Sequence, residues 1–128
     1  MTVTPVQDTG QEMPPTQGHA IGFVDTPEDC EAVVRSLNAL GFPDSAMLML
    51  AGEDGIQLLK RMMRDSLWGE ADQTVLQRGL KELELGHFVL TIQVNDREEG
   101  LVAAKAAAQH GGHSFTHFGA LVDDQLTP

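Results

Sequence analysis

The sequence predicts an α+β fold in which two strand–helix–strand units contribute to one antiparallel sheet. Apolar runs of strand length alternate with longer segments of helical periodicity. The two helices that follow strands also begin and end with similar residues at one constant offset along the chain. With 128 residues, of which 41% are hydrophobic, the chain suits one domain of ordinary size. We therefore expect a single domain over residues 19–128.

Residues 1–18 contain three of the six prolines and few large apolar side chains, so we expect a flexible tail there. From His19 the words "HAIGFVD" predict a strand. The helix predicted next, "TPEDCEAVVRSLNALGF", has Thr26 as N-cap, Pro27 as its first residue and Gly41 at its C-terminal end.

The second half of the chain repeats this pattern after a helical insert. "AMLMLAG" is an apolar run of strand length, and residues 55–86 have the periodicity of two helices, which Gly86 ends. "HFVLTIQV" alternates as a strand does, and the alanine-rich helix after it starts at the N-cap Asp96 and ends at paired glycines. "HSFTHFGALV" is the last predicted strand.

The caps Thr26 and Asp96 are 96 − 26 = 70 residues apart, and so are Gly41 and Gly111 (111 − 41 = 70), which indicates an internal repeat. Two such βαβ halves in one sheet define the ferredoxin-like arrangement. We expect four antiparallel strands in the order 4-1-3-2, with both helices on one face and a helical insert at about 55–86.

This arrangement would leave the other sheet face without helices. A partly apolar face of this kind suits a dimer partner or the insert helices as its cover. We expect a homodimer or a higher homo-oligomer, formed through this face or through the insert helices, and cover of the face by the insert within one chain stays open as the alternative. The residues expected on the bare face are Thr91, Gln93, His117, Gly22, Val24, Met47 and Met49.

The charge balance argues against the commonest anionic partners, although a local basic face stays open at Lys60, Arg61, Arg64, Arg78 and Lys81. Nineteen acidic and eight basic side chains give a formal net charge of −11, which repels phosphate backbones and anionic membranes. No apolar run has the length of about 20 residues that crosses a bilayer, and the N-terminus lacks the pattern of a signal peptide. We expect a cytoplasmic protein that binds neither nucleic acid nor membranes.

No catalytic motif is recognisable, so we expect no enzyme and no cofactor. The single cysteine, Cys30, rules out an internal disulfide and a cysteine-based zinc cluster, and acidic neighbours oppose its use as a nucleophile. The GxSxG, Walker-type and GxGxxG motifs are absent. Any small ligand is unknown at this point.

Three of the five histidines lie in "QHGGHSFTHFG", residues 109–119. We interpret this stretch as the end of a helix and the start of a strand, with His110 near the helix dipole and His117 on a semi-polar sheet face shared with His113. One alternative stays open. The predicted topology places Asp25, His87 and His113 on one rim of the sheet, where they could bind a metal ion.

Residues 19–122 resemble the small bacterial general-stress-protein family in the words "AIGFVDTPEDCEAVVRSLNALGF", "LELGHFVLTIQV" and "AAKAAAQHGGHSFTHFG". The resemblance implies a ferredoxin-like fold and a stress-related role without catalytic residues. Our leading expectation is a non-enzymatic, oligomerising module of a stress-response or regulatory type. The alternative is a small-ligand or metal-binding sensor that uses the rim of Asp25, His87 and His113.

Overall fold

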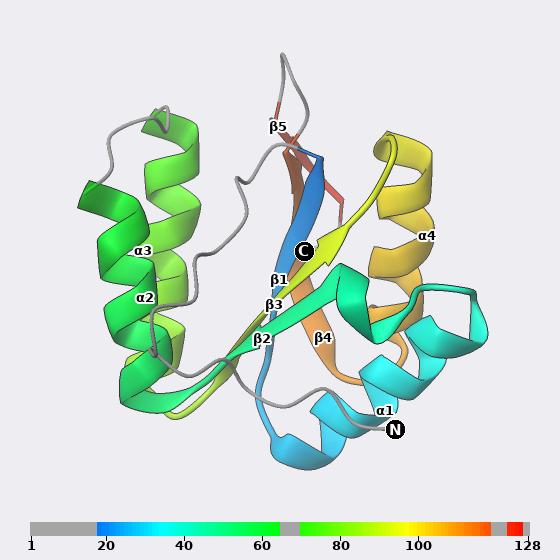
Figure 1. Cartoon of the computed structure of the whole chain (residues 1–128), viewed down its shortest axis with the longest axis horizontal. Helices are drawn as coiled ribbons and strands as arrows, with labels where there is room; N and C mark the ends of the chain where they lie inside the picture. Colours follow the sequence, from blue (N-terminus) through cyan, green and yellow to red (C-terminus); the bar gives the residue numbers. More distant parts are fainter. Residues whose placement is uncertain (1–17, 65–69, 119–122, 127–128) are drawn as a thin grey trace.

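The computed structural model describes residues 18–64, 70–118 and 123–126, and these form a mixed α+β structure (Figure 1). Its elements are, in chain order, β1 (His19–Val24), α1 (Pro27–Ala39), the short 3₁₀ helix η1 (Asp44–Ala46), β2 (Met47–Leu50), α2 (Gly52–Arg64), α3 (Glu70–Glu84), β3 (Phe88–Gln93), α4 (Arg97–Ala108), β4 (Gly112–Phe118) and β5 (Asp123–Gln125). The flexible tail expected at residues 1–18 lies outside the described residues except for Gly18, whose carbonyl accepts a hydrogen bond from the Val94 amide.

The sheet is antiparallel, with the order β2-β3-β1-β4-β5. Our expectation of a four-stranded sheet in the order 4-1-3-2 is corrected here. Read from the β2 edge, the first four strands stand in the order 2-3-1-4, which is the same set of neighbours written from the opposite edge, but β5 then extends the sheet beyond β4. Strand β5 was not predicted from the sequence, because its three residues are too few for a periodic signal.

The helix starts predicted from the sequence are confirmed. Thr26 Oγ1 accepts a hydrogen bond from the Asp29 amide at the start of α1, and Asp96 Oδ1 accepts one from the Glu99 amide at the start of α4. Each bond satisfies an amide that has no partner within the helix. The stretch that opens at Gln109 does end a helix and start a strand, because α4 stops at Ala108 and β4 begins at Gly112.

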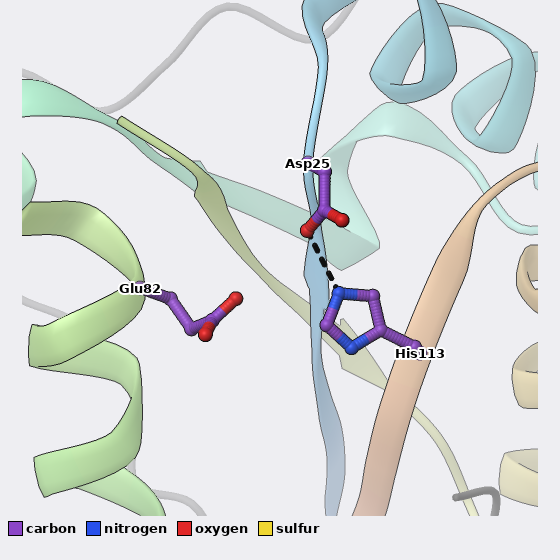
Figure 2. Close-up of side chains that lie close together, drawn as sticks. All are labelled: Asp25, Glu82 and His113. Atoms are coloured by element: carbon purple, nitrogen blue, oxygen red, sulfur yellow. Dashed lines mark hydrogen bonds and ion pairs between the residues drawn. The ribbon is translucent and has the colours of Figure 1, made fainter. Parts of the chain in front are cut away.

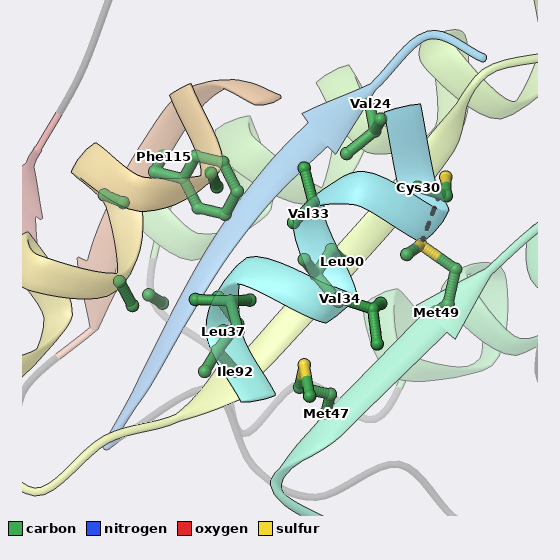
Figure 3. Packing of buried hydrophobic residues seen from close by; sticks show 14 of the residues in the cluster. Val24, Cys30, Val33, Val34, Leu37, Met47, Met49, Leu90, Ile92 and Phe115 are labelled. Carbon is green, nitrogen blue, oxygen red and sulfur yellow. Dashed lines mark hydrogen bonds between the residues drawn. The ribbon is translucent and has the colours of Figure 1, made fainter. Parts of the chain in front are cut away.

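Helices α1 and α4 pack on one face of the sheet and enclose the larger of two apolar clusters (Figure 3). Side chains of α1 meet those of β2 and β3 there, and the ring of Phe115 closes the cluster at β4. The backbone of β1 passes so close to this ring that position 22 requires a glycine. A Cβ atom at position 22 would lie 2.4 Å from the nearest ring carbon of Phe115, which is far inside van der Waals contact.

Helices α2 and α3 cover the opposite face, so the sheet lies between two helix pairs (Figure 1). The apolar cluster on this side is formed by Ile21, Phe23, Leu50, Leu58, Leu59, Leu76, Leu83 and Val89. The insert therefore covers this sheet face within the chain, which was the alternative to cover by a dimer partner. Among the residues assigned to this face, Val24, Met47 and Met49 belong to the cluster under α1 and α4.

A sheet with two apolar faces needs cover on both, and α2 and α3 supply the second cover within the same chain. The described residues contain no helix that combines the length and the apolar character needed to cross a membrane.

Candidate metal centre

A cluster of two imidazoles and two carboxylates lies where the ends of β1, α3 and β4 meet. Asp25 directly follows β1, His87 directly precedes β3, and His113 is the second residue of β4. The fourth member, Glu82, lies in the last turn of α3. Figure 2 shows Asp25, Glu82 and His113, whose side chains converge from three different elements.

The distances within the cluster are short. His113 Nε2 lies 2.8 Å from Asp25 Oδ1, and the Oδ1 atom is also 3.4 Å from His87 Nδ1. His87 Nδ1 lies 3.0 Å from Glu82 Oε1. One ligand atom each from Asp25, Glu82 and His113 fit within 4.8 Å of one another. The structure therefore brings together all three residues of the metal-site alternative, Asp25, His87 and His113, and adds Glu82.

Electrostatics keep Asp25 ionised. The hydrogen bond from His113 is the largest influence and lowers the pKa of this carboxyl below its ordinary value of 3.8, against a smaller opposing effect of desolvation. The positive charges that His113 and His87 carry when protonated lower the pKa further. The cluster thus presents an anionic oxygen that can accept a hydrogen bond from a protonated ring nitrogen or bind a cation.

A β-bulge directs His113 into the cluster. The register of β1 against β4 shifts between Ile21 and Phe23, and Ser114 has a φ of 58°, in the left-handed region that non-glycine residues rarely adopt. Because of this shift, His113 pairs with Phe23, and the two ring centroids are 6.0 Å apart. Bulges often re-aim a side chain next to a functional site.

The bulge also corrects our expectation that His113 and His117 share a sheet face. His117 lies on the α4 side, because a Cβ atom added at Gly100 would be 3.5 Å from its ring. The His117 side chain is buried, and its Nδ1 atom has no hydrogen-bond partner among the described residues. His110 follows α4 and is exposed. Neither residue belongs to the cluster.

Ser114 also touches the imidazole that it positions. Its Oγ atom is 3.3 Å from His113 Nδ1, so the two ring nitrogens of His113 have different partners. Histidine ligands of metal ions commonly have such a second partner, which fixes the ring and leaves the other nitrogen for the ion. The contact makes His113 Nε2 the nitrogen available for coordination.

The ligand set fits a tetrahedral ion of the zinc type. Bonds of about 2.0–2.1 Å place the ligand atoms of a tetrahedral site about 3.3–3.4 Å apart. Three of the six separations in the four-residue set, 2.8, 3.0 and 3.4 Å, are close to this value. The ligand atoms that all lie within 4.8 Å of one another are those of Asp25, Glu82 and His113, and His87 contacts this group through Asp25 and Glu82. Two imidazoles exclude a preference for calcium or magnesium, which bind oxygen ligands, and the two carboxylates balance the charge of a divalent ion.

Glu82 was not among the site residues predicted from the sequence, and the packing of α3 on the sheet shows why it belongs to the cluster. Gly79 packs against Leu59, Val89 and Phe23, so it marks the face of α3 that meets the sheet. Glu82 follows it by three positions and therefore lies close to the same face. Its side chain is only 12% exposed, and a carboxylate with so little water needs a charged or hydrogen-bonding partner.

Cys30 belongs to the apolar core, as the sequence analysis expected of a packing residue. Its Sγ atom lies 3.8 Å from Met49 Sδ within the α1 side of the core (Figure 3). Burial, with a smaller effect of Asp29, raises the pKa of the thiol to about 12. A thiol in this state is a poor nucleophile and a poor metal ligand.

Comparisons of the chain with protein-family models, with curated proteins and with solved structures found no match. The resemblance to the general-stress-protein family therefore stays a prediction, and the geometry of the cluster carries the functional argument.

Proposed function

We propose that this protein is a non-enzymatic metal-binding sensor that holds one divalent transition-metal ion through Asp25, Glu82, His87 and His113. Zinc is the ion that this ligand set suits best. The single observation that carries the proposal is the clustering of two carboxylates with two imidazoles, in which Asp25 Oδ1 and Glu82 Oε1 lie 2.8–3.4 Å from imidazole nitrogens.

The number of protein ligands favours a sensor over an enzyme. A catalytic zinc ion usually has three protein ligands and an open position for water or substrate, whereas four protein ligands close the coordination sphere. The ligands also come from separate parts of the fold, so an ion bound by all four would fasten α3 to the ends of β1 and β4. Metal binding would thereby change the stability of the α2 and α3 layer.

We further propose that the frame is ferredoxin-like. In this description β1, α1 and β2 form one half, β3, α4 and β4 form the other, and α2 and α3 are an insert that covers the second face. The general-stress-protein resemblance is compatible with such a frame. Self-association stays a prediction, but it no longer has a bare sheet face to support it, and for this reason we rank the sensor above the oligomerising module.

Isothermal titration of the metal-stripped protein with zinc tests the proposal, together with metal analysis of the protein as purified. Wild type should bind one zinc ion per chain. The double variant H87N/H113N should lose at least about 100-fold in affinity, because it removes two direct ligands and second-shell changes alone often cost 10–100-fold. H110N is the matched control, since His110 is exposed and outside the cluster.

Two further measurements keep the test informative if the double variant is poorly folded. E82Q replaces the carboxylate by a neutral group of the same shape and should also weaken zinc binding. Cobalt bound to wild type should give the intense visible bands of a tetrahedral complex. Equal zinc affinity in wild type, H87N/H113N and E82Q would refute the metal site and leave the cluster as a network of hydrogen bonds that joins α3 to the sheet.

A further inference from the structure

A groove on another part of the molecule has the properties of a docking site. It has a volume of about 580 Å³ and lies between the C-terminal end of α1, the end of β3 and the first turns of α4. Its size is within the range of about 300–1,000 Å³ typical of ligand sites. None of the four residues of the candidate metal centre lines it.

The apolar part of the groove is unusually exposed. Leu40 and Val102 are 51% and 50% exposed, and they are two of the three large hydrophobic side chains that are exposed in the described parts of the chain. Both line this groove, together with the half-buried Phe42. Exposed apolar side chains that gather at one place, rather than being scattered, are typical of interaction sites.

The charged part of the groove is uniformly negative. Asp96, Glu98 and Glu99 line it, and no lysine or arginine does so among the described residues. The C-terminal end of α1 adds to this potential, because Leu40 and Gly41 line the groove and the last turn of α1 has no basic side chain. The partial negative charge at a helix C-terminus favours a cation nearby.

The wall at the end of α1 is held in place before anything binds. Asn38 Nδ2 donates hydrogen bonds to the Phe42 carbonyl at 2.8 Å and to Asp44 Oδ1 at 3.1 Å. Across the groove, Asp96 caps α4, and Glu99 accepts a hydrogen bond from the Asn95 amide. A groove whose walls are already fixed loses little conformational entropy when it binds a ligand.

We propose that this groove binds a segment of a partner protein that carries arginine or lysine next to a large apolar side chain. Charge complementarity identifies the occupant: the apolar surface accepts the aliphatic side chain, and the three carboxylates with the end of α1 accept the cation. The proposal is independent of the metal site, because it rests on different residues.

A fluorescein-labelled synthetic peptide of alternating leucine and arginine is the probe, and fluorescence anisotropy with the full chain is the measurement. The same peptide with citrulline, the neutral isostere, in place of arginine is the control ligand. We expect the arginine peptide to bind more tightly, and its affinity to fall as the salt concentration rises. Amide shifts in the NMR spectrum should change at Leu40, Gly41 and Val102.

Two pairs of variants locate the site. Glu98→Lys should weaken binding by about fivefold or more, which is the scale of a reversed exposed charge, whereas Glu31→Lys on the exposed side of α1 should change it less than twofold. Val102→Asn should weaken binding, whereas Leu85→Asn, at the third exposed apolar side chain, should not. Asp25→Asn should leave peptide binding unchanged, which separates this proposal from the metal site.

Several outcomes would overturn the proposal. Equal binding of the arginine and citrulline peptides would remove the role of charge, and equal losses in Glu98→Lys and Glu31→Lys would show that only net charge matters. Shift changes elsewhere on the surface would place the peptide outside the groove. Arginine amide that binds as tightly as the peptide would make the groove a site for small cations instead.

Discussion

His113 Nε2 donates a hydrogen bond of 2.8 Å to Asp25 Oδ1, although 88 residues separate the two in the chain. The contact exists because β1 and β4 are neighbours in the sheet and because the bulge at Ser114 turns His113 to the side of α3. The same carboxylate lies next to His87, so one residue joins the two imidazoles of the candidate metal centre.

Ionisation of Asp25 should stabilise the folded protein over a defined pH range. Its pKa is lower in the folded state than its ordinary value of 3.8, so its contribution is complete above that value and is lost as the pH falls through the folded-state pKa. We expect the difference in unfolding free energy between wild type and Asp25→Asn to be constant at about pH 5–6 and to shrink below about pH 4. Urea titrations at each pH measure it, and a difference that grows in acid would contradict the assignment.

Zinc binding should release protons. Each imidazole that coordinates the ion must be deprotonated at the coordinating nitrogen, so protons compete with zinc and affinity should decline as the solution becomes more acidic. Titration calorimetry in buffers of different ionisation enthalpy counts the protons released. A binding enthalpy that is independent of the buffer, with affinity unchanged at acid pH, would mean that the histidines are not ligands.

Changes at Ser114 should separate stability from metal affinity. Ser114→Gly relieves the left-handed backbone strain, so stability should be kept or increased, while loss of the Oγ contact with His113 Nδ1 should weaken zinc binding about tenfold. Ser114→Val places a β-branched residue at a φ of 58° and should cost about 1–3 kcal/mol of stability. Thermal unfolding and zinc titration measure both effects, and a stable Ser114→Val protein would argue against a strained bulge.

Gly22→Ala should destabilise the protein by about 1–3 kcal/mol, because the new methyl group would collide with the ring of Phe115. In the Phe115→Leu background, Gly22→Ala should cost less unfolding free energy than it does in wild type, because the smaller leucine side chain leaves room for the new methyl group. Denaturant unfolding of the four proteins forms a double-mutant cycle. Strict additivity in that cycle would show that the ring does not lie over Gly22.

The thiol of Cys30 should resist modification in the folded protein. Burial raises its pKa to about 12, so the reactive thiolate is scarce near pH 8 and the side chain is covered. Reaction with a disulfide reagent should be slow under native conditions and fast in concentrated urea. Fast reaction of the native protein would mean that the start of α1 opens readily.

The sequence was sufficient for the elements whose signals are local. The N-cap side chains of Thr26 and Asp96 bond amides only three residues away, so they mark the starts of α1 and α4 in the sequence. The spacing of apolar residues marks β1 and β3 in the same way, so these four elements could be placed almost to the residue. The same reasoning placed Asp25, His87 and His113 near one rim, because each directly adjoins a strand end whose position in the sheet follows from the topology.

Only the tertiary structure shows on which face of the sheet each of these side chains lies. A single bulge at Ser114 puts His113 and His117 on opposite faces, and no periodic pattern shows where one extra residue enters a strand. Glu82 completes the cluster only because α3 lies against the sheet, on the face for which the sequence allowed either a dimer partner or the insert as cover. Periodicity shows that a helix has an apolar side, but long-range packing, in which α2 and α3 compete with solvent for the second sheet face, determines what that side covers.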